Sequence, residues 1–216
     1  EVRDLGVTIA GGARRAVTLN KRRLGTGAVR GQRVIKMVKV WRGAGKLMRT
    51  NVLPHSAFGF EVMGLAPTNL KSLRTMFAKG SGIGSKGVCA TTAIALLCGV
   101  EGDPAVTMRL SGVKEWLLAW GAEAHVRPRT RRAWPTIVRR ASGRGRWCRV
   151  SGPGSAIAAT LMDLNWQPRR PDSWLDPSGA EWRYEPGFTM QPLLETLKQQ
   201  ILASLWSGAQ LHHNGG

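Results

Sequence analysis

Five cationic side chains recur every three or four residues along the stretch from residue 30 to residue 53, a spacing that places side chains on one side of a helix. No Asp or Glu lies between Leu5 and Phe60. Unpaired like charges repel each other, so such a row is stabilised best by a partner that is itself a polyanion. A merely solvated helix face is the alternative. The five residues are Lys36, Lys39, Arg42, Lys46 and Arg49.

A second acid-free zone runs from residue 124 to residue 162, and all its cations are arginines, with Trp134 and Trp147 among them. Guanidinium groups bind phosphate in a bidentate manner, and indole rings stack on bases. This composition favours nucleic acid as the partner. Alternatively, the two tryptophans belong to the core and the arginines form a solvated rim. The candidate contacts of this zone are Arg127, Arg129, Arg131, Arg132, Arg139 and Arg140.

Other patterns that resemble catalytic or metal sites do not meet the requirements of those sites. The glycine-rich stretch 80–87 lacks a Lys directly after its last loop glycine followed by Ser or Thr, so we interpret it as a linker. Three cysteines at irregular spacing predict neither a zinc site nor a disulfide framework, and they favour a reducing compartment. We expect turn and helix-end positions for the later acids Asp163, Asp172, Asp176 and Glu181.

The basic row requires a helix to position it, and the sequence predicts one amphipathic helix from Arg30 to Leu53 that ends near Pro54. Its apolar side carries residues that we expect to face the core: Val34, Val38, Trp41, Met48 and Val52. The preceding basic, glycine-punctuated segment 13–31 is expected to be a loop or a frayed helix.

The remaining pattern predicts a mainly α fold, a helical bundle with a short strand over 4–10 and a small C-terminal β-hairpin over 174–182. Helices are expected over 67–79, 89–98, 156–165 and 191–206, and one more begins at Asp103-Pro104, a good cap and first-turn pair. We divide the chain into regions 1–12, 13–79, 80–150 and 151–216.

Composition narrows the classes of function. The chain has 216 residues, a net charge of +19 and a sequence pI of about 11.5. Such charge is unusual for an enzyme of small metabolites and typical of nucleic-acid binders, although a basic helix can also bind an anionic membrane surface. No apolar run approaches the roughly 20 residues that span a bilayer. The ends of the sequence suggest a piece of a longer polypeptide.

The order of several short motifs resembles the reverse transcriptases of non-LTR (LINE-type) retrotransposons. The motifs are Asp4-Leu5-Gly6-Val7, a basic helix ending in Lys46-Leu47, Val52-Leu53-Pro54, and Phe58-Gly59-Phe60-Glu61. In that family a Leu-Gly-Val strand closes the palm as the primer grip, and a basic thumb with a Leu-Pro and a Tyr-Gly-x-Glu stretch follows. Phe58 stands in the place of that tyrosine. The resemblance covers residues 3–79.

This resemblance implies a primer-grip role for Leu5, Gly6 and Val7, and phosphate contacts for the basic row. The partners would be RNA and DNA as a primer–template duplex, together with the rest of a larger polyprotein, in an intracellular and specifically nuclear setting. The family binds Mg²⁺ through an Asp-Asp pair in the palm. No Asp-Asp occurs in this chain, so we expect it to hold no cofactor and to be inactive alone. The alternative is a stand-alone structural protein that binds RNA or DNA.

Overall fold

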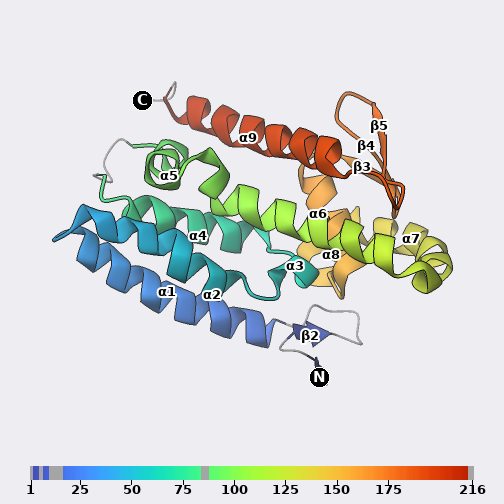
Figure 1. Cartoon of the computed structure of the whole chain (residues 1–216), viewed down its shortest axis with the longest axis horizontal. Coiled ribbons are helices and arrows are strands. Elements are labelled where there is room, and N and C mark those ends of the chain that lie inside the picture. The colour runs from blue at the N-terminus through green and yellow to red at the C-terminus, as the bar shows by residue number, and fades with distance from the viewer. Residues whose placement is uncertain (1, 5–6, 10–16, 84–87, 214–216) are drawn as a thin grey trace. The chain divides into compact units, whose positions relative to one another are not determined.

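The computed structural model describes residues 2–4, 7–9, 17–83 and 88–213. The described chain is mainly α-helical, which confirms the predicted fold class (Figure 1). It forms two compact units, each assembled from segments far apart in the sequence, whereas the sequence suggested four consecutive regions. Unit 1 comprises residues 1–17, 59–64 and 109–198, and unit 2 comprises residues 18–58, 65–108 and 199–216. The chain passes between them within two long helices, α6 (Pro104–Ala122) and α9 (Gln191–His213).

Unit 2 contains a helical hairpin. Its first arm is α1 (Thr18–Val38); its second arm consists of a 3₁₀ segment η1 (Arg42–Lys46), a π-helical segment η2 (Met48–Val52) and α2 (Leu53–Ala57). Two side-chain bonds show that the arms run antiparallel. Arg30 Nη1 donates to Asn51 Oδ1 at 3.3 Å, and Arg23 Nη1 donates to the Phe58 carbonyl at 2.8 Å.

The prediction of one helix from Arg30 to Leu53 is therefore wrong. The helix begins twelve residues earlier and ends at Val38, and the backbone at Trp41 is extended, with φ −139° and ψ 106°. Val34, Val38, Met48 and Val52 are buried as expected, but Trp41 is 64% exposed because the bend turns it away from the core. Pro54 lies in the first turn of α2, where a missing N–H costs nothing, and so it does not end a helix.

Glycines on the buried face of α1 explain why its helix was missed. A Cβ at Gly27 would lie 1.9 Å from Ser56 Oγ, and one at Gly31 would lie 2.1 Å from Met76 Sδ. A larger residue at either position would force the Ser56 or the Met76 side chain to move away from α1. The sequence-based prediction treated these glycines as signs of a loop or a frayed helix, whereas they are contact points between regular helices.

The rest of unit 2 packs behind the hairpin. It includes α4 (Pro67–Gly80), α5 (Ala90–Cys98), η3 (Val100–Gly102) and the later turns of α9. Asp103 caps α6 as predicted: its Oδ1 accepts the Ala105 N–H at 2.7 Å. The same carboxylate is held by Arg74 at 3.0 Å, and Arg74 also donates to Thr91 Oγ1 at 2.9 Å. The pair thus links α4 and α5 to the start of α6.

Unit 1 is organised around buried tryptophans. Its helical elements are α3 (Phe60–Met63), most of α6, η4 (Ala124–Val126), α7 (Arg127–Ala141), η5 (Arg146–Arg149) and α8 (Pro153–Asp163). The Trp116 ring centre lies 6.2 Å from that of Trp120 and 5.7 Å from that of Trp134. Trp116 and Trp134 also donate to the carbonyls of Pro171 and Pro168, at 2.8 and 2.9 Å. These bonds attach the C-terminal sheet to α6 and α7.

That sheet contains the predicted hairpin and one further strand. Its antiparallel order is β3 (Gln167–Arg170), β4 (Ser173–Leu175) and β5 (Glu181–Arg183), and Trp174 faces Trp182 in the register, as expected. The Gly179 N–H donates to the Asp176 carbonyl at 3.0 Å, and Gly179 has φ +89°. The predicted turn at Asp-Pro-Ser-Gly is therefore present.

At the N-terminus two short strands, β1 (Val2–Asp4) and β2 (Val7–Ile9), pair antiparallel, with Val2 opposite Ile9. The sequence predicted one strand over 4–10 instead. Val7 belongs to β2, whereas Leu5 and Gly6 lie outside the described residues.

Candidate nucleic-acid interface

The five cations of the predicted row are all exposed, but they do not share one helix. Lys36 lies in the last turn of α1, Lys39 in the bend, and Arg42 and Lys46 in η1, with Arg49 in η2. In the described residues, no carboxylate lies within ion-pair distance of any of them. The row thus follows the end of α1, the bend and the start of the second arm of the hairpin.

The earlier start of α1 adds a basic face that the sequence-based prediction missed. At 100° per residue, Arg22, Arg33 and Lys36 lie on the side of α1 opposite the buried Gly27, Val34 and Val38, and all three are exposed. From Arg22 to Lys36 the helix rises by about 21 Å, at 1.5 Å per residue. The signal available in the sequence was the spacing Arg22, Arg33, Lys36, which matches the helical period once the glycines are accepted inside the helix.

Between the two arms of the hairpin lies an open cleft of about 490 Å³. The Arg23 guanidinium lies 4.6 Å from the centre of the Phe58 ring, and Arg30 contributes a second guanidinium. Together with the neighbouring amide, imidazole and hydroxyl groups, the lining offers donors suited to phosphate oxygens, and the Phe58 ring is 55% exposed. The remaining lining residues are Thr50, Asn51, Pro54 and His55.

In unit 1, α7 presents a one-sided row of arginines. On a helical projection, Arg129, Arg132, Arg139 and Arg140 lie opposite the buried Trp134. All four are exposed, and none of the described carboxylates pairs with them. This helix, which contains Pro135, was not predicted as an element, although its arginines were named as candidates.

The other two candidate arginines of α7 make contacts within unit 1, although Arg131 remains exposed. Arg127 donates to the carbonyls of Trp120 and Gly121, at 2.8 and 2.7 Å, and so satisfies the C-terminal end of α6. Arg131 donates to Asp172 at 3.0 Å and lies over the Trp120 ring, with 5.4 Å to its centre. These contacts give both residues a structural role, and a role in binding stays a prediction.

Trp134 and Trp147 belong to the packing of unit 1. Trp134 is 1% exposed, and the half-buried Trp147 donates to Asp163 Oδ2 at 2.8 Å. Arg146 binds the other oxygen of the same carboxylate at 3.1 Å. The buried Trp134 is therefore a core residue, and Trp147 packs partly against the core of unit 1, whereas the role of the arginines in binding stays a prediction.

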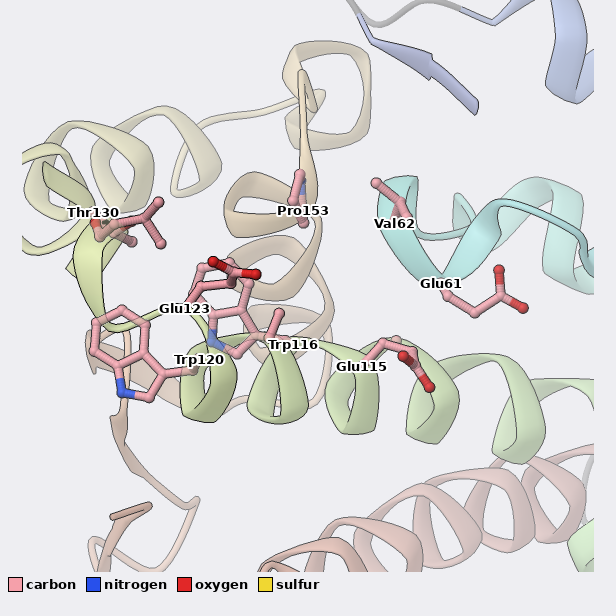
Figure 2. A pocket seen from close by; sticks show the side chains of 11 residues that line it. Glu61, Val62, Glu115, Trp116, Trp120, Glu123, Thr130 and Pro153 are labelled. Carbon is pink, nitrogen blue, oxygen red and sulfur yellow. Dashed lines mark hydrogen bonds between the residues drawn. The ribbon is translucent and has the colours of Figure 1, made fainter. Parts of the chain in front are cut away.

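A pocket of about 390 Å³ in unit 1 has a different character (Figure 2). Trp116, Trp120, Val62 and Pro153 contribute to an apolar lining, and carboxylates are present at its edge. In Figure 2 the carboxylates of Glu61 and Glu115 point away from the two indole rings. Apolar walls edged by carboxylates do not suit phosphate, so we leave this pocket out of the candidate interface. A third carboxylate of the lining belongs to Glu123.

The acids of the C-terminal region have structural partners. Asp163 and Asp172 each pair with an arginine, and Asp176 organises its turn. Within the described residues, no three His, Cys, Asp or Glu side chains gather in a group that could hold a metal ion. Of the helices that the structure describes, none is long and apolar enough to cross a membrane.

We compared the chain with protein families, with curated proteins and with solved structures. No family model, no curated protein and no solved structure matches the chain.

Proposed function

We propose that this chain is the primer–template-binding portion of a retroelement reverse transcriptase, and that it holds an RNA–DNA hybrid through its sugar–phosphate backbones. One observation carries the proposal. Segment 17–58 contains ten Lys and Arg residues and no acid, and none of the ten is buried. Folding would bring these charges together at a cost unless a polyanion offset their repulsion. The order of the motifs over residues 3–79 resembles non-LTR reverse transcriptases, and this resemblance is the reason for proposing that family.

In the proposed complex the outward face of α1 follows one strand. Its basic residues extend over about 21 Å, which corresponds to roughly six steps of 3.4 Å along a nucleic-acid strand. The cations of the bend and of η1 continue the contact. A hybrid duplex is recognised by shape and phosphate position, so lysine and arginine on a helix are sufficient without contacts to base edges.

The outward row of α7 supplies a second set of phosphate contacts. Arg129 and Arg140 are separated by about 17 Å along the helix, again several phosphate steps. Arginine suits this role because its planar fork binds two phosphate oxygens at once.

The proposal assigns no chemical step to this chain. Polymerisation would depend on palm carboxylates and Mg²⁺ outside these residues, and Leu5, Gly6 and Val7 would abut the primer end. A stand-alone RNA- or DNA-binding protein would use the same basic faces. The reading frame upstream of Glu1 distinguishes the two: an Asp-Asp after an aromatic residue within about a hundred codons supports the polymerase, and an initiator codon directly upstream contradicts it.

The binding test uses fluorescence anisotropy with a 20-base-pair RNA–DNA hybrid. Charge reversal at Lys39, Arg42 and Lys46 together is expected to weaken binding at least tenfold, since each phosphate contact contributes to affinity. The matched control reverses three exposed cations outside both basic faces, Lys71, Lys114 and Arg183, and changes the net charge by the same amount. Equal losses in both variants would contradict the proposed surface, because only net charge would then matter.

A further inference from the structure

The bend between α1 and η1 exposes an apolar tip. Met37 is 46% exposed, Val40 93% and Trp41 64%. A tryptophan this exposed is unusual, because indole is one of the most stabilising groups to bury. The structure therefore presents a large flat ring at the end of the helical hairpin, next to two further exposed apolar residues, Met37 and Val40.

Backbone bonds fix the shape of this tip. The N–H groups of Val40 and Trp41 both donate to the Met37 carbonyl, at 3.0 and 2.8 Å. On the far side, the Ala44 N–H donates to the Trp41 carbonyl at 3.0 Å. The bend is thus a hydrogen-bonded turn, and Trp41 projects from a defined backbone position.

Gly43 provides a seat for the indole. A Cβ at this position would lie 2.6 Å from two carbons of the Trp41 ring and 2.8 Å from its Nε1. The ring therefore lies directly against the backbone of residue 43, and glycine is required for that contact. One side of the ring is supported by the chain, and much of the remainder is open to solvent.

The charges around the tip indicate the chemistry of its occupant. Lys36, Lys39 and Arg42 flank the apolar residues in the sequence, all three are exposed, and no described carboxylate pairs with them. A second copy of the chain would bring two such sets of cations together, which opposes self-association through this surface. A planar aromatic ring attached to a phosphate satisfies both features at once, since it stacks on indole and neutralises the cations.

We infer that Trp41 is a stacking platform for an unpaired nucleobase at the end of the bound hybrid, with Lys39 and Arg42 holding the adjoining phosphates. This inference rests on the proposed function and adds to it a preference for junctions between duplex and single strand. Stacking on an aromatic side chain is tolerant of base identity. The site therefore recognises the presence of an unpaired base and not its sequence.

The test compares a blunt 20-base-pair hybrid with the same hybrid carrying a four-nucleotide single-stranded extension. The wild-type chain is expected to bind the extended hybrid about tenfold more tightly, within the range of one stacked base. Trp41→Ala is expected to abolish that preference while changing affinity for the blunt hybrid by less than about twofold. Trp41→Phe should retain part of the preference, because a smaller aromatic ring still stacks.

Two further variants control for fold and ring position. Trp206→Ala removes the other tryptophan of unit 2, which is 38% exposed, and should leave the preference unchanged. Gly43→Ala keeps the indole but displaces it from its seat, so the preference should fall. Circular dichroism spectra and melting curves confirm that each variant is folded.

The outcomes separate the two proposals. Failure of the wild type to bind blunt hybrid would contradict the proposed function, and this inference with it. Binding without a preference for the extension, or a preference that survives Trp41→Ala, would overturn this inference alone. Binding to vesicles of phosphatidylcholine and phosphatidylserine that depends on Trp41, without any preference among hybrids, would assign the tip to a membrane surface instead.

Discussion

At the scale of single residues, Asp176 shows how one carboxylate determines a turn. Its Oδ1 accepts from the Ser178 hydroxyl at 2.6 Å and from the N–H groups of Ser178 and Ala180, and its Oδ2 accepts from Trp182 Nε1 at 3.0 Å. These donors, the Ser178 hydroxyl foremost, lower the pKa of Asp176 from 3.8 to about 2. The ionised form is therefore the one that stabilises the fold.

This shift predicts the pH dependence of stability. Because the pKa is lower in the folded state, the contribution of Asp176 is present above pH 4 and is lost as the pH falls through about 2. In Asp176→Asn an amide N–H₂ faces the Trp182 N–H, so the variant is less stable at pH 7 and loses less stability between pH 4 and 2. Urea unfolding over that range measures this. Parallel pH profiles of wild type and variant would contradict the assignment.

A substitution at Trp134 is expected to lower the free energy of unfolding without changing the affinity for the hybrid. Trp134→Phe removes the bond to the Pro168 carbonyl and leaves a cavity beside Trp116, so we expect a loss of about 2–4 kcal/mol in the free energy of unfolding. Trp41→Phe, at an exposed site, should change this free energy by less than about 0.5 kcal/mol. Below the melting temperature, hybrid affinity of Trp134→Phe should equal that of wild type. Weaker binding by the folded variant would contradict this prediction and would indicate that Trp134 contributes to binding the hybrid.

These residues also show which details the sequence could predict. The roles of Asp103 and Asp176 follow from neighbours within a few positions, so local rules for caps and turns found both. The positions of Trp41 and Trp134 depend on a bend and on a distant strand. Periodicity placed Trp41 on the buried side because it continued the helical phase of α1 across a segment that is not helical.

At the scale of elements, α1 shows the limits of a hydrophobic pattern. The period of the apolar residues continues through residue 52, yet the helix ends at Val38 and the chain reverses at Trp41. Gly45 accounts for part of this: a Cβ there would lie 2.8 Å from the Gly80 carbonyl oxygen. Such a close approach to α4 is a tertiary requirement, which no local pattern reports.

The arginine row of α7 is the element whose predicted role is easiest to isolate. Reversing Arg129, Arg132 and Arg139 to Glu should weaken binding to the hybrid at least tenfold, because these side chains are exposed and do not pair with the described carboxylates. The melting temperature should change little, since no packing is removed. The charge-matched triple at Lys71, Lys114 and Arg183 again serves as control. Unchanged affinity in the α7 variant would restrict the interface to unit 2.

At the scale of the whole molecule, the basic charge is distributed unevenly. Unit 2 contains fourteen Lys and Arg residues and two acids, whereas unit 1 contains eighteen and eleven. The acids of unit 1 include structural partners for arginines, such as Asp163 and Asp172. Composition alone predicted the anionic partner, but only the fold shows which cations are already paired and which remain exposed.

The salt dependence of hybrid binding tests the central claim most directly, because it counts the phosphates that the chain neutralises. About five contacts by the row from Lys36 to Arg49 predict a log–log slope of affinity against salt of roughly −3.5 to −4.5, and contacts by Arg22, Arg33 and the arginines of α7 would make it steeper. Charge reversal at Lys39, Arg42 and Lys46 should flatten the slope by about 2 to 3. A wild-type slope near zero, or one that this variant leaves unchanged, would contradict the account.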